Sequence, residues 1–217
     1  MRDLFRFSLN ANLFRAIALL VIAGTIMDTY VRYEETQKII EKRVHDRAKS
    51  LYEYFISMRF VFHQQFIKSG LDLNDSTVGF LPAHAASLIS DEFEKKASQK
   101  ISIRNVSDNP RNPKNKADKD EVEAIEYFRA HPNEQEFSKN ISADGSEFYF
   151  YAAPLKISEY CLACHGTKNQ TMPYIKNKYS SAYDYNVGDV RGVTSVKIEK
   201  RAFADPMMDI FLETTVF

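Results

Sequence analysis

Residues 147–155 form the stretch Glu-Phe-Tyr-Phe-Tyr-Ala-Ala-Pro-Leu, the part of the sequence on which the fold prediction depends most. The stretch is short and almost entirely apolar or aromatic, which predicts a strand that is buried on both faces. A second candidate strand, residues 136–141, precedes it, and Ala-Asp-Gly-Ser at 143–146 lies between the two. Asp-Gly between such runs is a hairpin signal, so the sequence predicts two antiparallel strands joined by a tight turn.

The residues on either side of this hairpin predict the rest of the domain. Apolar residues recur at spacings of three and four from Ile40 to Phe66, which predicts a long amphipathic helix that ends at Ser69-Gly70. Residues 166–189 are expected to form a long polar loop. The remaining elements complete an antiparallel sheet with helices packed on it, which is an α+β fold. They are helices at 82–97, opened by Pro82, and 118–130, and strands at 101–105 and 189–199.

The composition is that of a globular domain without a nucleic-acid-binding surface. The chain has 217 residues, with 29 Lys and Arg against 29 Asp and Glu, so its formal net charge is zero. A nucleic-acid-binding protein would need an excess of basic residues to neutralise phosphates. Hydrophobic residues make up 44% of the chain, which is enough for a core, and two cysteines are too few for a disulfide-rich scaffold.

The N-terminus carries a membrane signal. Arg2, Arg6 and Arg15 lie before or at the start of the apolar run 16–27. A spanning helix needs about 20 residues, and the flanking residues extend the run to 13–31. Positive charges before the run favour a cytoplasmic N-terminus, with the rest of the chain on the other side. A cleaved signal peptide and a buried soluble helix remain alternatives, although no good cleavage site follows the run.

Both cysteines lie in Cys161-Leu162-Ala163-Cys164-His165, which is the C-x-x-C-H signature of covalent haem attachment. The two thiols can form thioethers to the vinyl groups of one haem, and the adjacent histidine can then bind the iron. A zinc site would need two further ligands at suitable spacing. A redox dithiol would follow a strand of a βαβ unit, and a disulfide across so short a loop would constrain little. Haem c is the favoured interpretation among these alternatives.

Several segments around this motif carry a resemblance to a known family. They are TVGFLPAH (77–84), ISDEF (89–93), RNVSDNPRNP (104–113), YAAP (151–154), YCLACHG (160–166) and YDYNVGDVRGV (183–193). With them the chain resembles, from about Glu34 to Arg201, the bacterial periplasmic c-type haem sensor domains with a PAS-like fold, formerly a domain of unknown function. The resemblance implies a small antiparallel sheet that cradles one covalent haem beside a long N-terminal helix.

Domains of this family often precede a histidine kinase, a diguanylate cyclase or a chemoreceptor module. This chain reaches Phe217 without one, so we expect either a separate signalling effector or a truncated chain. The expected protein is a single-pass bacterial inner-membrane protein whose soluble domain lies in the periplasm. Its expected parts are a basic cytoplasmic N-terminus at 1–12, an anchor at 13–31, a PAS-like haem c domain at 32–201 and a C-terminal tail at 202–217.

The second axial ligand of the expected haem is open. His84, at the first turn of a predicted helix, is the favoured candidate and His63 on the long helix is the alternative, while Met58 and a vacant position remain. A cysteine thiolate occurs in some family members, but this chain has no third cysteine. Arg111, between two prolines, is a candidate partner for a haem propionate, although a solvated loop arginine is the favoured interpretation. Tyr160 is a candidate contact of the haem, with an ordinary core aromatic as the alternative.

The sequence favours a sensor of redox state or of a small gaseous ligand. The alternative functions are a monohaem electron-transfer cytochrome and, if the motif is a coincidence, a haem-free binding module. Acidic residues such as Glu121 and Glu123 are expected on a solvated helix face without an acid–base partner, so no catalytic site and no enzyme activity are expected. The spacing in the long helix also suggests a parallel homodimer.

Overall fold

The computed structural model describes residues 2–98 and 100–201. The tail expected at 202–217 lies outside the described residues. Over the described residues the chain divides into two compact units, one that extends to Arg43 and one that begins at Val44. The sheet and the candidate site belong to the second unit.

The first element is one long helix, α1 (Arg2–Ser69), which confirms the helix end predicted at Ser69-Gly70. Gly70 has φ 63°, the left-handed conformation that commonly terminates a helix. Within the described residues, this is the one helix that is long and apolar enough to cross a membrane. Its apolar window lies near the N-terminus, has a mean hydropathy of 1.6 and is not buried. A signal sequence would have the same length, position and hydropathy, so these properties alone make the helix a candidate membrane span and no more.

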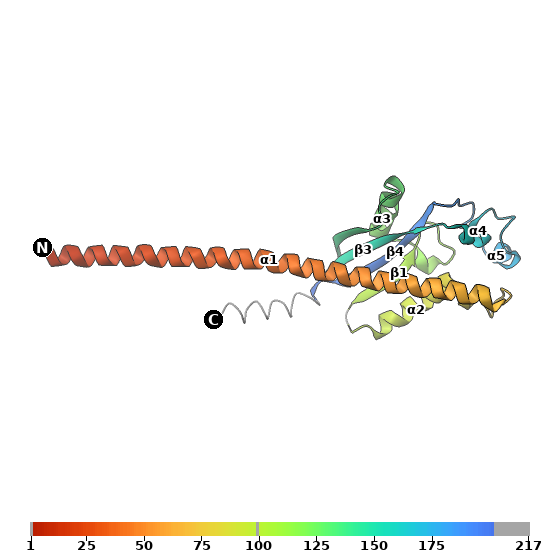
Figure 1. Ribbon diagram of the computed structural model, residues 1–217, viewed down its shortest axis with the longest axis horizontal. Coiled ribbons are helices and arrows are strands. Elements are labelled where there is room, and N and C mark those ends of the chain that lie inside the picture. The colour runs from red at the N-terminus through yellow and green to blue at the C-terminus, as the bar shows by residue number, and fades with distance from the viewer. Residues whose placement is uncertain (1, 99, 202–217) are drawn as a thin grey trace. The chain divides into compact units, whose positions relative to one another are not determined.

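Four strands form an antiparallel sheet in the order β1-β4-β3-β2. This confirms the predicted α+β architecture and the position of each predicted strand. Figure 1 labels β1, β3 and β4 of this sheet. The first and last of these strands, β1 and β4, are neighbours in the sheet, so their hydrogen bonds join residues that are far apart in the sequence. The strands are β1 (Ile101–Val106), β2 (Phe137–Ala143), β3 (Ser146–Lys156) and β4 (Val190–Glu199).

The predicted hairpin connects β2 and β3. Ala143 pairs with Ser146, and Asp144 and Gly145 between them have φ 50° and 73°. Positive φ at both central residues is the type I′ turn that Asp-Gly favours, because its twist matches that of the strands. Pro154 lies beyond the last residue of β3 that pairs with β2, where β3 has a partner on one side only. A proline is tolerated at such a place because it cannot donate to a second ladder.

The two faces of β3 pack against different helices. Phe150 and Ala152 join the core cluster that includes Ile125 and Phe128 of α3 (Lys119–Ala130). On the other face, Tyr149 and Tyr151 meet side chains of α1: His45 Nδ1 is 2.8 Å from the Tyr149 hydroxyl, and Tyr52 contacts the Tyr151 ring. Residues Tyr149 to Ala153 are all buried, which confirms the prediction of a strand covered on both faces.

Glu121 is a correction to the sequence analysis. It was expected on a solvated face, but its side chain is fully buried and pairs with Arg104 at 2.8 Å and with Lys197 at 3.4 Å. Glu121 also accepts from the backbone of Asp118, and Asp118 accepts from the backbone of Glu121, so the two form the capping box that begins α3. The two cations come from strands β1 and β4, which a pattern along α3 cannot show.

Helix α2 (Pro82–Lys96) begins at Pro82 as predicted and packs beside β1. The expected loop 166–189 is wrong in one part, because it contains helix α5 (Pro173–Lys178). This helix spans six residues, too few to show a helical period, and it is opened by Pro173. The remaining short elements are η1 (Val78–Phe80), η2 (Pro113–Asn115), η3 (Glu159–Cys161) and α4 (Leu162–His165).

Candidate functional site

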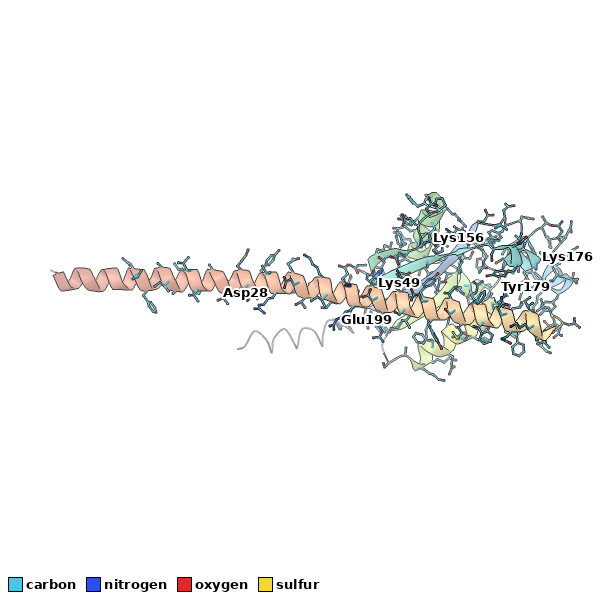
Figure 2. All side chains as sticks on the ribbon, in the orientation of Figure 1. Asp28, Lys49, Lys156, Lys176, Tyr179 and Glu199 are labelled. Carbon is cyan, nitrogen blue, oxygen red and sulfur yellow. The ribbon has the colours of Figure 1, made fainter. Side chains whose placement is uncertain are left out.

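A cavity of about 610 Å³ opens in the second unit, and Cys161, Cys164 and His165 lie in its wall. Its volume is within the range of about 300–1,000 Å³ that is usual for sites of cofactors and other small molecules. The wall is formed by α1, the start of α2, the end of β1 with the residues that follow it up to η2, the end of β3, the segment from η3 to α5, and the start of β4. Figure 2 places Tyr179, one of its lining residues, at the end of the unit that carries α5 and far from Glu199 at the end of β4.

The C-x-x-C-H segment folds as two short consecutive helical turns. Cys161 ends η3, and α4 follows directly and ends at His165. Both cysteines are half-buried free thiols. Ser158 holds the first one, because its hydroxyl lies 3.3 Å from the Cys161 sulfur and its amide 3.5 Å from the same atom. Burial raises the pKa of the Cys164 thiol, so Cys164 does not resemble the activated thiolate of a redox dithiol.

His165 has the protonation state and tautomer that a metal ligand requires. Burial, with the positive charges of Arg191 and Arg111, lowers the pKa of His165 to about 3, so the ring is neutral at physiological pH. Its Nδ1 lies 3.0 Å from the backbone carbonyl of Ala182. A carbonyl can only accept, so Nδ1 carries the proton and Nε2 keeps the lone pair that binds a metal.

The carbonyl that orients His165 is itself held by Arg111. Nη2 of Arg111 donates to the carbonyls of Ala182 at 3.0 Å and Cys164 at 2.5 Å, and Nε donates to that of Ser181 at 3.1 Å. Ala182 is buried and has φ 59°, an uncommon conformation for alanine that such contacts stabilise. Arg111 therefore fixes the loop against the C-x-x-C-H segment, and three of its five N–H bonds are used for backbone carbonyls.

The charges along the cavity wall have one sign. Arg59, Arg111, Lys156 and Arg191 line it, and none of its described lining residues is an aspartate or glutamate. Much of the remaining wall is apolar, with Ile56, Phe60, Phe66, Ile67, Leu81, Leu155 and Ile175. A large apolar cavity with uncompensated positive charge suits a ligand that is mostly apolar and carries negative groups.

His84 and His63, the two candidates for a second axial ligand, both line this cavity. Burial lowers the pKa of each, with Lys178 contributing at His84 and Arg59 at His63, so both rings are neutral. His84 Nε2 is 3.0 Å from the Tyr179 hydroxyl. Met58, in contrast, is not among the residues that line the cavity.

Tyr160 also lines the cavity, and its ring lies 4.4 Å from that of His63. It is 52% exposed, so it is a rim residue rather than a core aromatic. All the site residues predicted from the sequence therefore line one cavity in the structure. They are Cys161, Cys164, His165, Arg111, Tyr160, His84 and His63.

Sequence reasoning missed several residues that shape the cavity. Ala182, Tyr179 and Arg191 lie in the later part of the chain, and Arg59 lies on α1. The motif 183–193 contains Arg191, but nothing in its spacing indicated a role for that residue. Within residues 2–98 and 100–201, no group of three or more His, Cys, Asp or Glu side chains is arranged to hold a bare metal ion.

Comparisons with known proteins agree with this architecture. A family model described as Tll0287-like matches residues 35–199. The crystal structure of the cyanobacterial heme-protein Tll0287 covers 71% of this chain and 93% of its own, with 24% sequence identity and a TM-score of 0.55. A search of curated proteins found no match. At this identity the structural likeness supports the fold, whereas the family match extends over most of the chain and confirms the resemblance seen in the sequence: the chain belongs to the Tll0287-like family.

Proposed function

We propose that the unit Val44–Ala202 binds one haem covalently through Cys161 and Cys164, with His165 as an axial ligand of the iron. The observation that supports it most is the state of His165, a neutral imidazole whose Nδ1 is engaged by Ala182 and whose Nε2 is left as the ligating atom. Both cysteines precede this histidine in the chain and line the same cavity. The related cyanobacterial protein Tll0287 is described as a heme protein, which is consistent with this proposal.

The rest of the cavity suits the same group. A haem has a broad apolar ring and two carboxylates, and the cavity combines apolar side chains with cations that have no acidic neighbour in the described wall. When bound, a haem supplies a one-electron couple and an iron position at which ligands can exchange. Arg111 and Ala182 hold His165 in place, and side chains of α1 and Leu81 give the cavity an apolar wall.

We propose that the protein uses this site as a sensor of redox state or of a small gaseous ligand, without catalysis. Helix α1 supplies part of the cavity wall, including Arg59 and His63, and also contains the apolar N-terminal run. A change at the iron that alters the packing of α1 would thus act on an element that both units share. A signalling effector that contacts this helix is the proposed partner.

We also propose that residues 13–31 anchor the protein in the bacterial inner membrane, with the haem domain in the periplasm. Apolar side chains in this stretch are solvent-exposed in the structure, among them Leu19, Leu20 and Ile22. Such a surface is unfavourable in water and suits a lipid environment. Covalent haem attachment in bacteria takes place on the far side of the inner membrane, which fits the orientation suggested by the basic N-terminal residues.

Absorption spectra of the purified full chain test the proposed function. We expect a haem spectrum whose pigment stays with the polypeptide after denaturation. For a sensor of a gaseous ligand, the reduced spectrum should change when CO or NO is added. A six-coordinate spectrum that ignores both gases would favour pure redox sensing or an electron-transfer cytochrome, and a colourless chain from a host that matures c-type haem would contradict the proposal.

His84 is the proposed second axial ligand, and its substitution gives a separate prediction. In His84→Ala we expect the oxidised spectrum to change from low-spin to high-spin, because the neutral Nε2 that would complete the coordination is removed. His63→Ala is the matched control, since His63 is a second neutral histidine in the same wall. If only His63→Ala changes the spin state, the ligand is His63; if neither does, the position is held by another group.

A further inference from the structure

Two arginines of the cavity wall, Arg59 on α1 and Arg191 on β4, have no anionic partner in the part of the chain that the structure describes. Arg59 Nε is buried and makes no hydrogen bond. Two other arginines of this unit do have a carboxylate partner: Arg104 pairs with Glu121 at 2.8 Å and Arg129 with Asp108 at 2.6 Å. A buried donor without a partner destabilises the folded chain, and more so when the donor is charged.

These two positive charges also act on each other and on the site. Burial lowers the pKa of Arg191 to about 10, and the charge of Arg59 is the next largest cause. Arg191 and His165 line the same cavity. The main chain holds Arg191 at this position, because the Ser107 hydroxyl donates to its carbonyl at 2.6 Å. The cavity thus keeps two like charges together without a counter-charge from its described wall.

We propose that Arg59 and Arg191 form a carboxylate-binding subsite inside the cavity. A planar guanidinium binds a carboxylate through parallel hydrogen bonds, and a buried charge-assisted pair would compensate both the unpaired Arg59 Nε and the repulsion between the two groups. Arg111 is less suited to this role, because three of its donors are already used by backbone carbonyls. If the bound carboxylates are those of the haem, the subsite rests on the proposed haem function and adds detail to it. The other possible ligand is a free small carboxylate.

Acetate titration of the haem-free full chain tests the subsite without relying on haem. In the Cys161→Ala/Cys164→Ala background, acetate should raise the thermal unfolding temperature in a saturable way. The apparent affinity for acetate should fall at least about tenfold in Arg59→Gln/Arg191→Gln. This is the decrease expected when one charge-assisted hydrogen bond is lost. Lys176→Gln, which removes a positive charge from exposed α5, is the matched control and should keep the affinity.

The response of the haem-loaded chain distinguishes the two sources. If the carboxylates of the haem fill the subsite, acetate should leave the loaded chain unchanged. If a free small carboxylate fills it, acetate should shift the unfolding temperature of the loaded chain as well. If no haem can be attached, the haem function fails while the titration of the haem-free chain still tests the subsite.

Substitution of Arg191 alone provides a second readout that does not depend on added anion. Arg191→Gln should raise the unfolding temperature of the haem-free chain, because it relieves repulsion with Arg59. In the chain whose subsite holds a carboxylate, the same substitution should lower the unfolding temperature, because it removes a partner of that carboxylate. Arg191→Lys keeps the charge and should retain the acetate response with weaker affinity. An increase in both forms, or an acetate response that persists unchanged in Arg59→Gln/Arg191→Gln, would overturn the proposal.

Discussion

Replacing Cys161 and Cys164 together with alanine is expected to abolish covalent haem attachment completely. The chain has no other cysteine, so no thioether can form elsewhere, and any haem that still enters the cavity should be extracted by acid and organic solvent. Either single substitution leaves one thiol and should give a chain that keeps its pigment on a denaturing gel with a shifted absorption band. The measurement is haem staining of the denatured chain, normalised to protein.

Ser158→Ala is the matched control for this prediction. It removes the hydroxyl that lies 3.3 Å from the Cys161 sulfur but leaves both thiols in place, so the pigment should remain covalently bound. The double variant should also unfold at lower temperature than the haem-loaded chain, because a bound group stabilises the folded state by mass action. Pigment that resists extraction from the double variant would show that the attachment site is elsewhere.

The sequence predicts those parts of the fold whose signals are local. Asp144-Gly145 sets the hairpin because the turn needs positive φ at both residues, and Gly70 ends α1 for a related reason. Helix α5 was missed because six residues show no period, and its packing depends on one buried residue, Ile175. The pairing of β1 with β4 is equally invisible in a single sequence, since it joins strands at opposite ends of the domain.

The site residues likewise divide into those with a local sequence signal, which were predicted, and those without one, which were missed. Cys161, Cys164 and His165 are predicted from the sequence, because covalent attachment of one haem would require them at a fixed spacing along the chain. Arg59 and Arg191 come from α1 and β4, and no spacing relates them. Arg111 was identified as a cavity residue, but only the folded chain shows that its donors reach the carbonyls behind His165. Whether it also contacts a propionate stays a prediction.

Gly192→Ala should destabilise this domain strongly, because Gly192 leaves less room for a Cβ than any other glycine of the described residues. A Cβ at Gly192 would lie 2.0 Å from the Val106 carbonyl oxygen and 3.2 Å from the Ser107 Cα. These are main-chain atoms of β1 and the residue after it, so no side-chain rotation relieves the clash. We expect a loss of about 3 kcal/mol, the upper part of the usual range for overpacking. This corresponds to roughly 6–12 °C in unfolding temperature for a domain of this size.

Gly79→Ala is the control, because a Cβ there meets nothing within 4 Å and the residue has no positive φ, so its unfolding temperature should stay near that of the wild type. The effect of Gly192→Ala should extend to the site. Gly192 lets β4 approach Val106 closely enough for the Ser107 hydroxyl to hold the Arg191 carbonyl at 2.6 Å. Separating the strands would move Arg191 from the cavity wall, so any folded variant should also lose acetate affinity. Wild-type stability in Gly192→Ala would mean that β1 and β4 lie further apart at this point and that Arg191 does not lie in the wall of the proposed haem site.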